Sequence, residues 1–411
     1  MKTAIRLPLW GVLVVLALGT CLFTPSHQVP SATKSLVTIP ADVTGYGLIF
    51  VRTRINNSEP LWFALDSGAS FPVVIDIRRA RDLGLKLQDN LTLDGGAGAA
   101  TFEVAMTRGV SVDLGGLELA DQTAAVFALS SLEAIAGRPL DGLVGRELFS
   151  RYVVEIDYLG NKISLYAPQT YTYTGAGESI PLALRGDYLF VPAKIELPGR
   201  PPLEGQFLLD TGGGFVTAIL NAPFARSRGV PAPTQRAVLD RSLSGLGGEI
   251  RLLVSRATSF ALGKLAIREP VIYASQDRGG ALARADFDGV IGGEILRRFT
   301  VIFDYPRRRL ILEPNAHYAE PVEYDMSGIR LRAGGGDFRT FKVYQVLENS
   351  PAAHAGLREG DVLAAIDGAP ASRFSLDEIY QMLKQQGREY KLSVRRGSET
   401  LFVIIKTQRL I

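Results

Sequence analysis

The chain has 411 residues, of which 45 are basic and 42 acidic, so its net charge of +3 is close to balance. With no long basic stripe, this charge does not indicate a nucleic-acid-binding protein. The length is too great for one ordinary core, and a hydrophobic content of 46% with 43 glycines excludes a disordered chain and indicates several folded, turn-rich units.

The N-terminal segment is apolar after a basic start. Lys2 and Arg6 precede an uncharged stretch from Leu7 to Phe23. This pattern predicts that residues 1–35 are a secretory signal peptide or an N-terminal membrane anchor and that the rest is exported, either to the periplasm or anchored with its folded part outside the cytoplasm. Cleavage, retention and lipidation at Cys21 stay open, and this single cysteine excludes an internal disulfide.

One unit is written twice after this segment. The stretch DGLVGRELFSRYVVEIDYLGNKISLY from Asp141 matches DGVIGGEILRRFTVIFDYPRRRLILE from Asp288, at an offset of 147. The stretches FALDSGAS and FLLDTGGG also match, with Asp66 and Asp210 lying 144 positions apart. Because the two registers agree within three residues, the sequence predicts two lobes of one architecture, residues 36–170 and 171–320.

Short apolar runs punctuated by Gly, Asn and Asp predict that both lobes are mainly β. Short helices are expected near Asp76 to Leu85 and after each DG loop, at RELFSRY and GEILRRF. The runs expected to form strands are YGLIFVRTRIN, LWFALD, VVEIDY and KISLY in the first lobe, and YLFVPAKIEL, QFLLD, TVIFDY and RLILE in the second.

After about Pro321 the pattern changes to that of a small α+β domain, residues 321–411. It reads strand, small-residue helix, turn, strand, amphipathic helix and two strands. In SLDEIYQMLKQQG the apolar residues take helical spacing, with Ser375 as the predicted N-cap and Gly387 as the stop.

The doubled Asp-Ser/Thr-Gly is the strongest functional signal. One copy is expected by chance in roughly one chain of this length in five. Here each copy follows an apolar lead-in and precedes an apolar glycine loop, DGLVG or DGVIG, by a similar distance. The alternative is a pair of repeat-related turns in which each aspartate caps a loop.

Over roughly residues 40–315, these paired elements resemble the aspartic peptidases of the pepsin and retroviral-protease type. The resemblance implies two pseudo-twofold-related lobes in one chain, with Asp66 and Asp210 as the catalytic dyad and no need for dimerisation. Two adjacent carboxyl groups cannot both ionise easily, so the pair holds one proton, and its ionised member can activate a water for attack on a peptide bond. Such chemistry needs no metal and no organic cofactor.

The residues after each aspartate have implied roles of support. The resemblance implies that the hydroxyls of Ser67 and Thr211 hydrogen-bond across the lobe interface. Gly68 and Gly212 remove a side chain where two backbones and a substrate approach closely. Ala69 and Gly213 stand where pepsins carry a hydroxyl residue, which is closer to the retroviral form.

Neither lobe carries the tyrosine flap typical of pepsins. The stretches LDGGAGAATFEV (93–104) and RSLSGLGGEIRL (241–252) lie at matching places and are both rich in glycine. They are either plain hairpin turns or, as we expect, two mobile flaps that close over an extended peptide. The flap candidates are Gly95, Gly96, Gly98, Gly245, Gly247 and Gly248.

The C-terminal stretch VLENSPAAHAGLREGDVLAAIDG resembles the PDZ domains of exported bacterial proteases. PDZ domains bind an extended peptide, often a C-terminus, as an added strand beside their second helix. The resemblance implies a carboxylate-binding loop at MSGIRL, with Ser327, Gly328 and Ile329 as contacts. A PDZ-like domain with a purely structural role is the alternative.

Together these features predict an exported aspartic endopeptidase whose PDZ domain recruits or gates protein or peptide substrates. The alternative is a catalytically inactive peptide-binding scaffold with protease-like lobes. His27, His317 and His354 lie far apart without metal-ligand spacing, so no metal site is expected.

Overall fold

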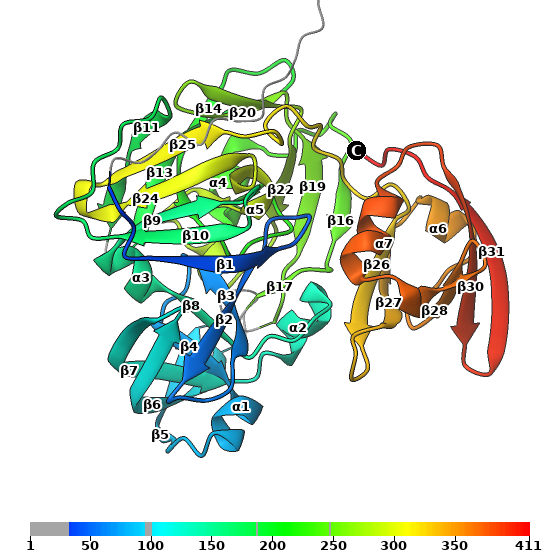
Figure 1. Ribbon diagram of the computed structural model, residues 1–411. Helices are drawn as coiled ribbons and strands as arrows, with labels where there is room; N and C mark the ends of the chain where they lie inside the picture. The colour runs from blue at the N-terminus through cyan, green and yellow to red at the C-terminus, as the bar shows by residue number, and fades with distance from the viewer. Residues whose placement is uncertain (1–32, 95–100, 186–187, 246–247) are drawn as a thin grey trace, which may run out of the picture.

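The computed structural model describes residues 33–94, 101–185, 188–245 and 248–411 of the chain. It is mainly β with a smaller C-terminal α+β region, so the predicted fold class is confirmed (Figure 1). The predicted signal peptide or anchor falls almost entirely outside these residues. Within them, no helix is both long and apolar enough to cross a membrane.

Lobe 1, as we call residues 36–170, is built around three neighbouring strands. Strand β3 (Leu61–Asp66) runs parallel to β8 (Gly142–Gly145), and β4 (Val73–Asp76) pairs antiparallel with the other side of β8. The remaining elements of this lobe are β1 (Val37–Val43), β2 (Ile49–Ile55), α1 (Ile77–Asp82), β5 (Gln88–Asp94), β6 (Thr101–Leu114), β7 (Leu117–Phe127), α2 (Ser130–Ala136), α3 (Arg146–Arg151), β9 (Val153–Asp157) and β10 (Lys162–Tyr166).

Lobe 2, residues 171–320, repeats this arrangement. Strand β14 (Leu203–Leu209) runs parallel to β23 (Gly289–Ile291), and β15 (Ala218–Leu220) pairs antiparallel with β23. The sequence repeat is therefore a repeat of topology. The other elements are β11 (Glu178–Pro181), β12 (Ala183–Arg185), β13 (Tyr188–Glu196), α4 (Ala222–Arg228), β16 (Val238–Asp240), β17 (Ser244–Gly245), β18 (Gly248–Glu249), β19 (Leu252–Arg256), β20 (Ser259–Leu262), β21 (Leu265–Arg268), β22 (Val271–Ser275), α5 (Gly293–Leu296), β24 (Phe299–Asp304) and β25 (Arg309–Pro314), with short 3-10 turns at Ala281–Ala283 and Tyr305–Arg307.

Six strands join the two lobes in the order β11-β25-β24-β9-β10-β1. At the centre β9 pairs antiparallel with β24, with Val154 opposite Phe303 and Ile156 opposite Val301. These side chains belong to one hydrophobic core that spans both lobes. The eight apolar runs expected to be strands all form strands, because each buries alternate or successive apolar residues in this core.

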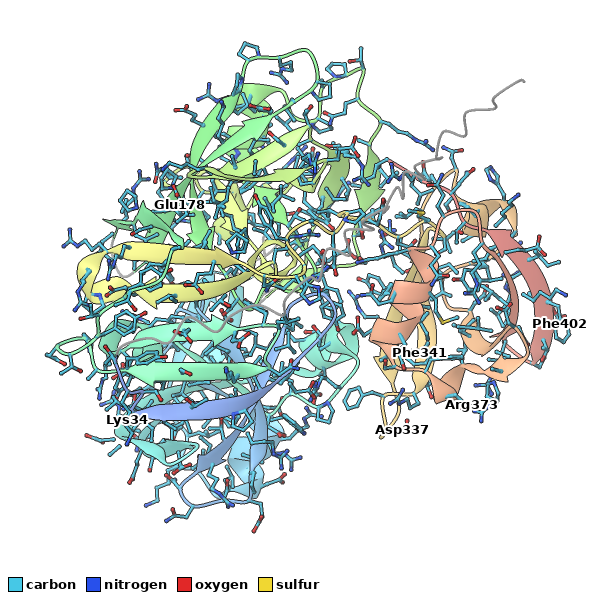
Figure 2. The ribbon with its side chains drawn as sticks, turned by 45° about the horizontal axis from the view of Figure 1, so that its top comes forward. Lys34, Glu178, Asp337, Phe341, Arg373 and Phe402 are labelled. Atoms are coloured by element: carbon cyan, nitrogen blue, oxygen red, sulfur yellow. The ribbon has the colours of Figure 1, made fainter. Side chains whose placement is uncertain are left out.

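The third domain has its own sheet and its own core. Strands β26 (Ile329–Gly334), β27 (Thr340–Val346), β28 (Val362–Ile366), β30 (Glu389–Arg396) and β31 (Glu399–Lys406) follow in that order, with β29 (Ala369–Pro370) beside β28. Strand β31 forms the far edge, where Phe402 is exposed away from the lobes (Figure 2). The core also takes residues from α6 (Pro351–His354), the 3-10 turn Ala371–Arg373 and α7 (Leu376–Leu383).

Helix α7 begins as predicted and ends earlier than predicted. Ser375 and Glu378 form a reciprocal capping box at its start. The helix stops at Leu383 rather than near Gly387, because Thr407 of the C-terminal segment draws the next residues into a turn: its hydroxyl donates to the Gln385 carbonyl and its carbonyl accepts from the Gly387 amide.

Candidate active site

The two predicted catalytic aspartates occupy equivalent places in the repeated topology. Asp66 is the last residue of β3, and Asp210 directly follows β14. The backbone amide of Asp210 donates to the carbonyl of Ile291 on the neighbouring β23 at 2.9 Å. In lobe 1, Asp66 is paired in register with Gly145 of β8. Each aspartate therefore leaves the sheet beside its apolar glycine loop.

The residues that follow the aspartates lock the two loops together. The Ser67 hydroxyl donates to the Leu209 carbonyl at 2.8 Å, and the Thr211 hydroxyl donates to the Leu65 carbonyl at 2.8 Å. Each hydroxyl also accepts from the other loop, since the Ser67 amide lies 3.0 Å from Thr211 Oγ1 and the Thr211 amide 3.1 Å from Ser67 Oγ. Both side chains are buried, so these four symmetric hydrogen bonds fix one loop against the other.

This lock brings the two carboxyl groups together. A Cβ placed on Gly212 would lie 2.7 Å from Asp66 Cγ, and one placed on Gly68 would lie 3.0 Å from Asp210 Cγ. The two carboxyl groups are therefore adjacent, and each lies close enough to affect the pKa of the other. Each also accepts a backbone amide, from Gly68 to Asp66 Oδ1 at 2.8 Å and from Gly212 to Asp210 Oδ1 at 2.9 Å. The glycines are needed because any side chain there would displace a carboxyl group.

The electrostatics of the pair favour a bound proton. Burial, followed by the charge of Asp210, raises the pKa of Asp66 well above its ordinary value. Burial also raises the pKa of Asp210, against the opposing effect of the Gly212 amide. Both residues nevertheless keep partial exposure, so water can reach them. A partly exposed acid pair that retains one proton can act as a general base and a general acid at once.

Two further aspartates hold the strands that carry the dyad. Asp141 Oδ2 accepts the Trp62 amide at 2.8 Å, and Asp288 Oδ2 accepts the Gln206 amide at 2.7 Å. Both lie at the start of the repeated DG loops, so their equivalence was visible in the sequence. Their positioning role was not predicted, because it depends on which strand lies beside each loop.

The predicted flap residues are placed only in part. Gly95, Gly96, Gly98 and Gly247 lie outside the described residues. Gly245 lies in β17 and Gly248 in β18, which pair as a two-stranded hairpin. Helix α2 of lobe 1 contacts β17, and the Glu249 carboxylate accepts the Tyr344 hydroxyl of the third domain at 2.8 Å.

The predicted peptide-binding loop of the third domain is engaged by its own chain. The Asp325 Oδ1 atom accepts the amides of Ser327 at 3.0 Å and Gly328 at 2.6 Å. The Ile329 amide donates to Ser327 Oγ at 3.0 Å. An internal carboxylate therefore sits where the sequence predicted a peptide carboxylate, and no pattern in the sequence pointed to Asp325.

Possible metal ligands do not cluster in the described part of the chain. It contains no group of three or more His, Cys, Asp or Glu side chains that could hold a metal ion. His317 Nδ1 lies 2.7 Å from the Glu320 carboxylate, and no serine hydroxyl is hydrogen-bonded to a histidine among these residues.

Comparisons with known proteins agree with this division of the chain. Residues 51–148 match the family model of aspartyl proteases, and residues 342–396 match that of PDZ domains. A protein of Synechocystis sp. named as a serine protease, HhoA, is 36% identical over 70 residues, which is 16% of this chain and 17% of that protein. The chain thus spans only a small share of that relative's length. It carries one region that is similar to aspartyl proteases and one that is similar to PDZ domains.

Proposed function

We propose that this protein is an aspartic endopeptidase in which Asp66 and Asp210 act as a dyad and the PDZ domain recruits or gates protein substrates. The observation that carries the proposal is the adjacent pair of carboxyl groups, Asp66 and Asp210, fixed by the Ser67 and Thr211 lock. The aspartyl-protease match over residues 51–148, which includes Asp66, supports it.

In this mechanism the ionised carboxyl takes a proton from a water molecule as the oxygen attacks the scissile carbonyl carbon. The protonated carboxyl donates to the carbonyl oxygen, which becomes the hydroxyl of a tetrahedral intermediate. When the C–N bond breaks, the carboxyl that took the water proton passes it to the departing nitrogen, and the other carboxyl takes back the proton of the intermediate's hydroxyl as the product carbonyl forms, so the dyad returns to its singly protonated state. The amides of Gly68 and Gly212 keep each carboxyl oriented throughout.

A serine-type mechanism, which the name of the Synechocystis relative would suggest, is less well supported. Such a mechanism needs a hydroxyl within reach of a general base, usually a histidine. His317 is instead paired with Glu320, whose carboxylate also binds Arg297 at 3.1 Å. The aspartic mechanism needs only the two carboxyl groups and a water molecule, and no histidine.

The test is cleavage of a denatured protein mixture, with released peptides identified by mass spectrometry. Wild type should release peptides, whereas Asp66→Asn and Asp210→Asn should each lose at least about a thousandfold in rate, because a neutral amide cannot serve as the base. Asp82→Asn, at an exposed ion pair with Arg79, is the matched control and should keep full activity. Equal activity in all four proteins would overturn the proposal, and a folded but inactive wild type would favour the peptide-binding scaffold.

We also propose that the folded part works outside the cytoplasm, released into the periplasm or held at the membrane by the N-terminal segment. The basic start and the apolar stretch to Phe23 support this proposal. Cell fractionation of the full chain against a chain that starts at Thr33, after an initiating methionine, tests it, since the shortened chain should remain in the cytoplasm.

A further inference from the structure

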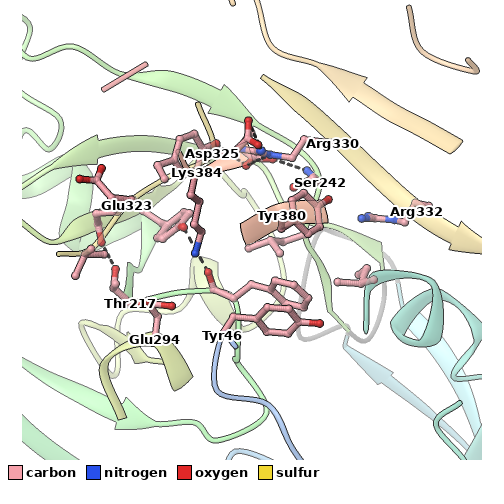
Figure 3. A pocket seen from close by; sticks show the side chains of 18 residues that line it. Tyr46, Thr217, Ser242, Glu294, Glu323, Asp325, Arg330, Arg332, Tyr380 and Lys384 are labelled. Carbon is pink, nitrogen blue, oxygen red and sulfur yellow. Dashed lines mark hydrogen bonds and ion pairs between the residues drawn. The ribbon is translucent and has the colours of Figure 1, made fainter. Parts of the chain in front are cut away.

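The third domain packs against both lobes through one side. Around a cavity of about 80 Å³, Arg330, Tyr380 and Lys384 of the third domain face Tyr46 of lobe 1 and Glu294 of lobe 2 (Figure 3). The opposite edge of its sheet, β31, points away from the lobes. The side that carries β26 and α7 is therefore the docked side.

A buried cluster of charges fixes this contact. Arg330 Nε lies 2.9 Å from Asp240 Oδ2 in lobe 2, and Arg330 Nη1 lies 3.3 Å from Asp325 Oδ1. The Tyr324 hydroxyl donates to the same Asp240 oxygen at 2.7 Å, and its ring lies under the guanidinium. All four side chains are buried. A buried pair with this many partners is costly to separate, so the docking has a defined geometry.

Strand β27 of the third domain holds the second glycine-rich segment, residues 241–245 and 248–252, through its side chains. Gln345 Oε1 accepts the Arg241 amide at 2.8 Å, and Gln345 Nε2 donates to the Leu239 carbonyl at 2.9 Å. The Tyr344 hydroxyl donates to Glu249 beyond the hairpin turn, and Arg332 on β26 reaches Ser244 at 3.4 Å. Both arms of the β17–β18 hairpin are thus tied to the third domain.

This hairpin is a short extension of lobe 2, anchored at its base by the bond from the Ile250 amide to the Leu243 carbonyl at 2.9 Å. Its strands are two residues long each, and at its base the chain continues into the antiparallel ladder of β16 and β19. Its described contacts outside lobe 2 are with α2 and with the third domain. The side-chain bonds from Tyr344 and Gln345 therefore add to this anchor and restrain the part of the segment beyond the ladder.

The edge at which a PDZ domain would take a peptide is covered in the same arrangement. The Tyr380 hydroxyl on α7 donates to the Leu331 carbonyl at 3.2 Å and accepts its amide at 2.9 Å, so it occupies both backbone groups that Leu331 would offer to an added strand. Helix α2 contacts β26, and Asp377 of α7 accepts the Gly45 amide of lobe 1 at 2.9 Å.

We propose that strand β27 of the docked third domain binds the chain's own second glycine-rich segment while the β26 edge is covered, so that this domain takes an internal segment rather than a free peptide C-terminus, and that this contact keeps the segment ordered beside the lobes. The bound segment belongs to lobe 2. Its Arg241 amide donates to Gln345, and its Glu249 carboxylate accepts from Tyr344. The contact between β27 and this segment does not depend on the proposed peptidase activity. An effect of this contact on substrate cleavage would rest on the proposed function.

The test is hydrogen exchange of the full chain, read on peptides that cover residues 238–252. The double variant Tyr344→Phe, Gln345→Met removes three hydrogen bonds with little change in volume. Exchange in that segment should become roughly tenfold faster or more, because its opening then costs less. Peptides from β30 and β31 should exchange as in wild type, which shows that the third domain stays folded.

Tyr173→Phe is the matched control, since the Tyr173 hydroxyl also donates to a glutamate, Glu313, at 2.5 Å. It should leave exchange over 238–252 unchanged. Unchanged exchange in the folded double variant would overturn the proposal. So would saturable binding of a fluorescent peptide with a free C-terminal valine to wild type. Neither readout needs hydrolysis, so a failure of the proposed peptidase activity would leave this test intact.

Discussion

At the dyad, hydrogen bonds from backbone amides favour the charged carboxylates, whereas burial away from water disfavours them. Gly68 and Gly212 donate to Asp66 and Asp210, but burial dominates and raises the pKa of both carboxyl groups. The native protein therefore holds a proton that the unfolded chain has already released above the ordinary aspartate pKa of about 4.

This retained proton predicts an unusual pH dependence of stability. Above pH 4 the folded state binds more protons than the unfolded state, so the dyad's contribution to stability falls as pH rises, by up to about 1.4 kcal/mol per pH unit for each proton, until the raised pKa is passed. Asp66→Asn removes the acid pair. Its melting temperature should exceed that of wild type by a margin that grows from pH 4 to pH 7. A margin that shrinks over this range would contradict the raised pKa.

The same proton sets the pH range of activity. Hydrolysis should decline as pH rises through the pKa of the protonated member, because the doubly ionised pair lacks a proton for the substrate carbonyl. The rate of peptide release measured against pH would show this descending limb.

The lock between the loops is a second feature at this scale. Thr211→Val keeps the shape of the side chain but leaves the Ser67 amide and the Leu65 carbonyl without their partner. Each unsatisfied buried group costs about 1–3 kcal/mol, so urea unfolding should show a loss of at least about 2 kcal/mol.

Thr53→Val is the matched control, because Thr53 is also fully buried but its hydroxyl has no hydrogen-bond partner among the described residues. That change should be neutral or stabilising. Equal losses in the two variants would mean that the lock contributes no stability.

At the scale of elements, the fold depends on the close approach of each apolar glycine loop to the backbone of the segment that carries the aspartate. A Cβ on Gly145 would lie 1.8 Å from the Asp66 carbonyl oxygen, and one on Gly292 would lie 2.2 Å from that of Gly213. Backbone atoms cannot yield as a flexible side chain can. Glycine at these positions therefore lets each apolar loop approach the segment that carries its aspartate, at Asp66 itself in lobe 1 and at Gly213 in lobe 2.

We expect Gly145→Ala to destabilise the protein by at least about 3 kcal/mol and to lower activity further, because the shift falls on Asp66 itself. Chemical unfolding and the peptide-release assay measure the two effects. Gly336→Ala is the control, since a Cβ there meets open space. If Gly145→Ala retained wild-type stability, the close approach would not be as described.

At the scale of the whole molecule, the buried cluster of Asp240, Arg330 and Asp325 joins the third domain to lobe 2. Although burial opposes it, Arg330 lowers the pKa of Asp240 below its ordinary value. The ion pair of Asp240 with Arg330 therefore stabilises the fold above the ordinary aspartate pKa, and this stabilisation is lost as pH falls through the lowered pKa of Asp240. The pH dependence is opposite in sign to that of the dyad.

Arg330→Met should cost about 3–5 kcal/mol in denaturant unfolding, because it leaves buried carboxylates without their cation. Adding Asp240→Asn should restore part of that loss, since it removes one of the uncompensated charges. Arg108→Met, at the exposed pair with Asp89, should cost less than about 1 kcal/mol. A cost for Arg330→Met as small as for Arg108→Met would show that the cluster does not hold the domains together.

The sequence predicted what depends on local pattern and on the repeat. Strands such as β3 and β14, the helix start at Ser375 and the equivalence of Asp66 and Asp210 all follow from spacing along the chain. Contacts between distant segments could not be predicted in this way. Asp240 and Arg330 lie 90 positions apart without a shared motif, and Asp325 resembles any other acidic residue before a turn.

The six strands that join the lobes hold them together without help from the linker, residues 167–177. Backbone hydrogen bonds between β9 and β24, together with the hydrogen bonds of the Ser67 and Thr211 hydroxyls, hold the two lobes together. A cut in the stretch between β10 and β11, residues 167–177, would therefore leave two fragments that stay associated. On this view we expect the two lobes, produced as separate chains, to assemble into one particle.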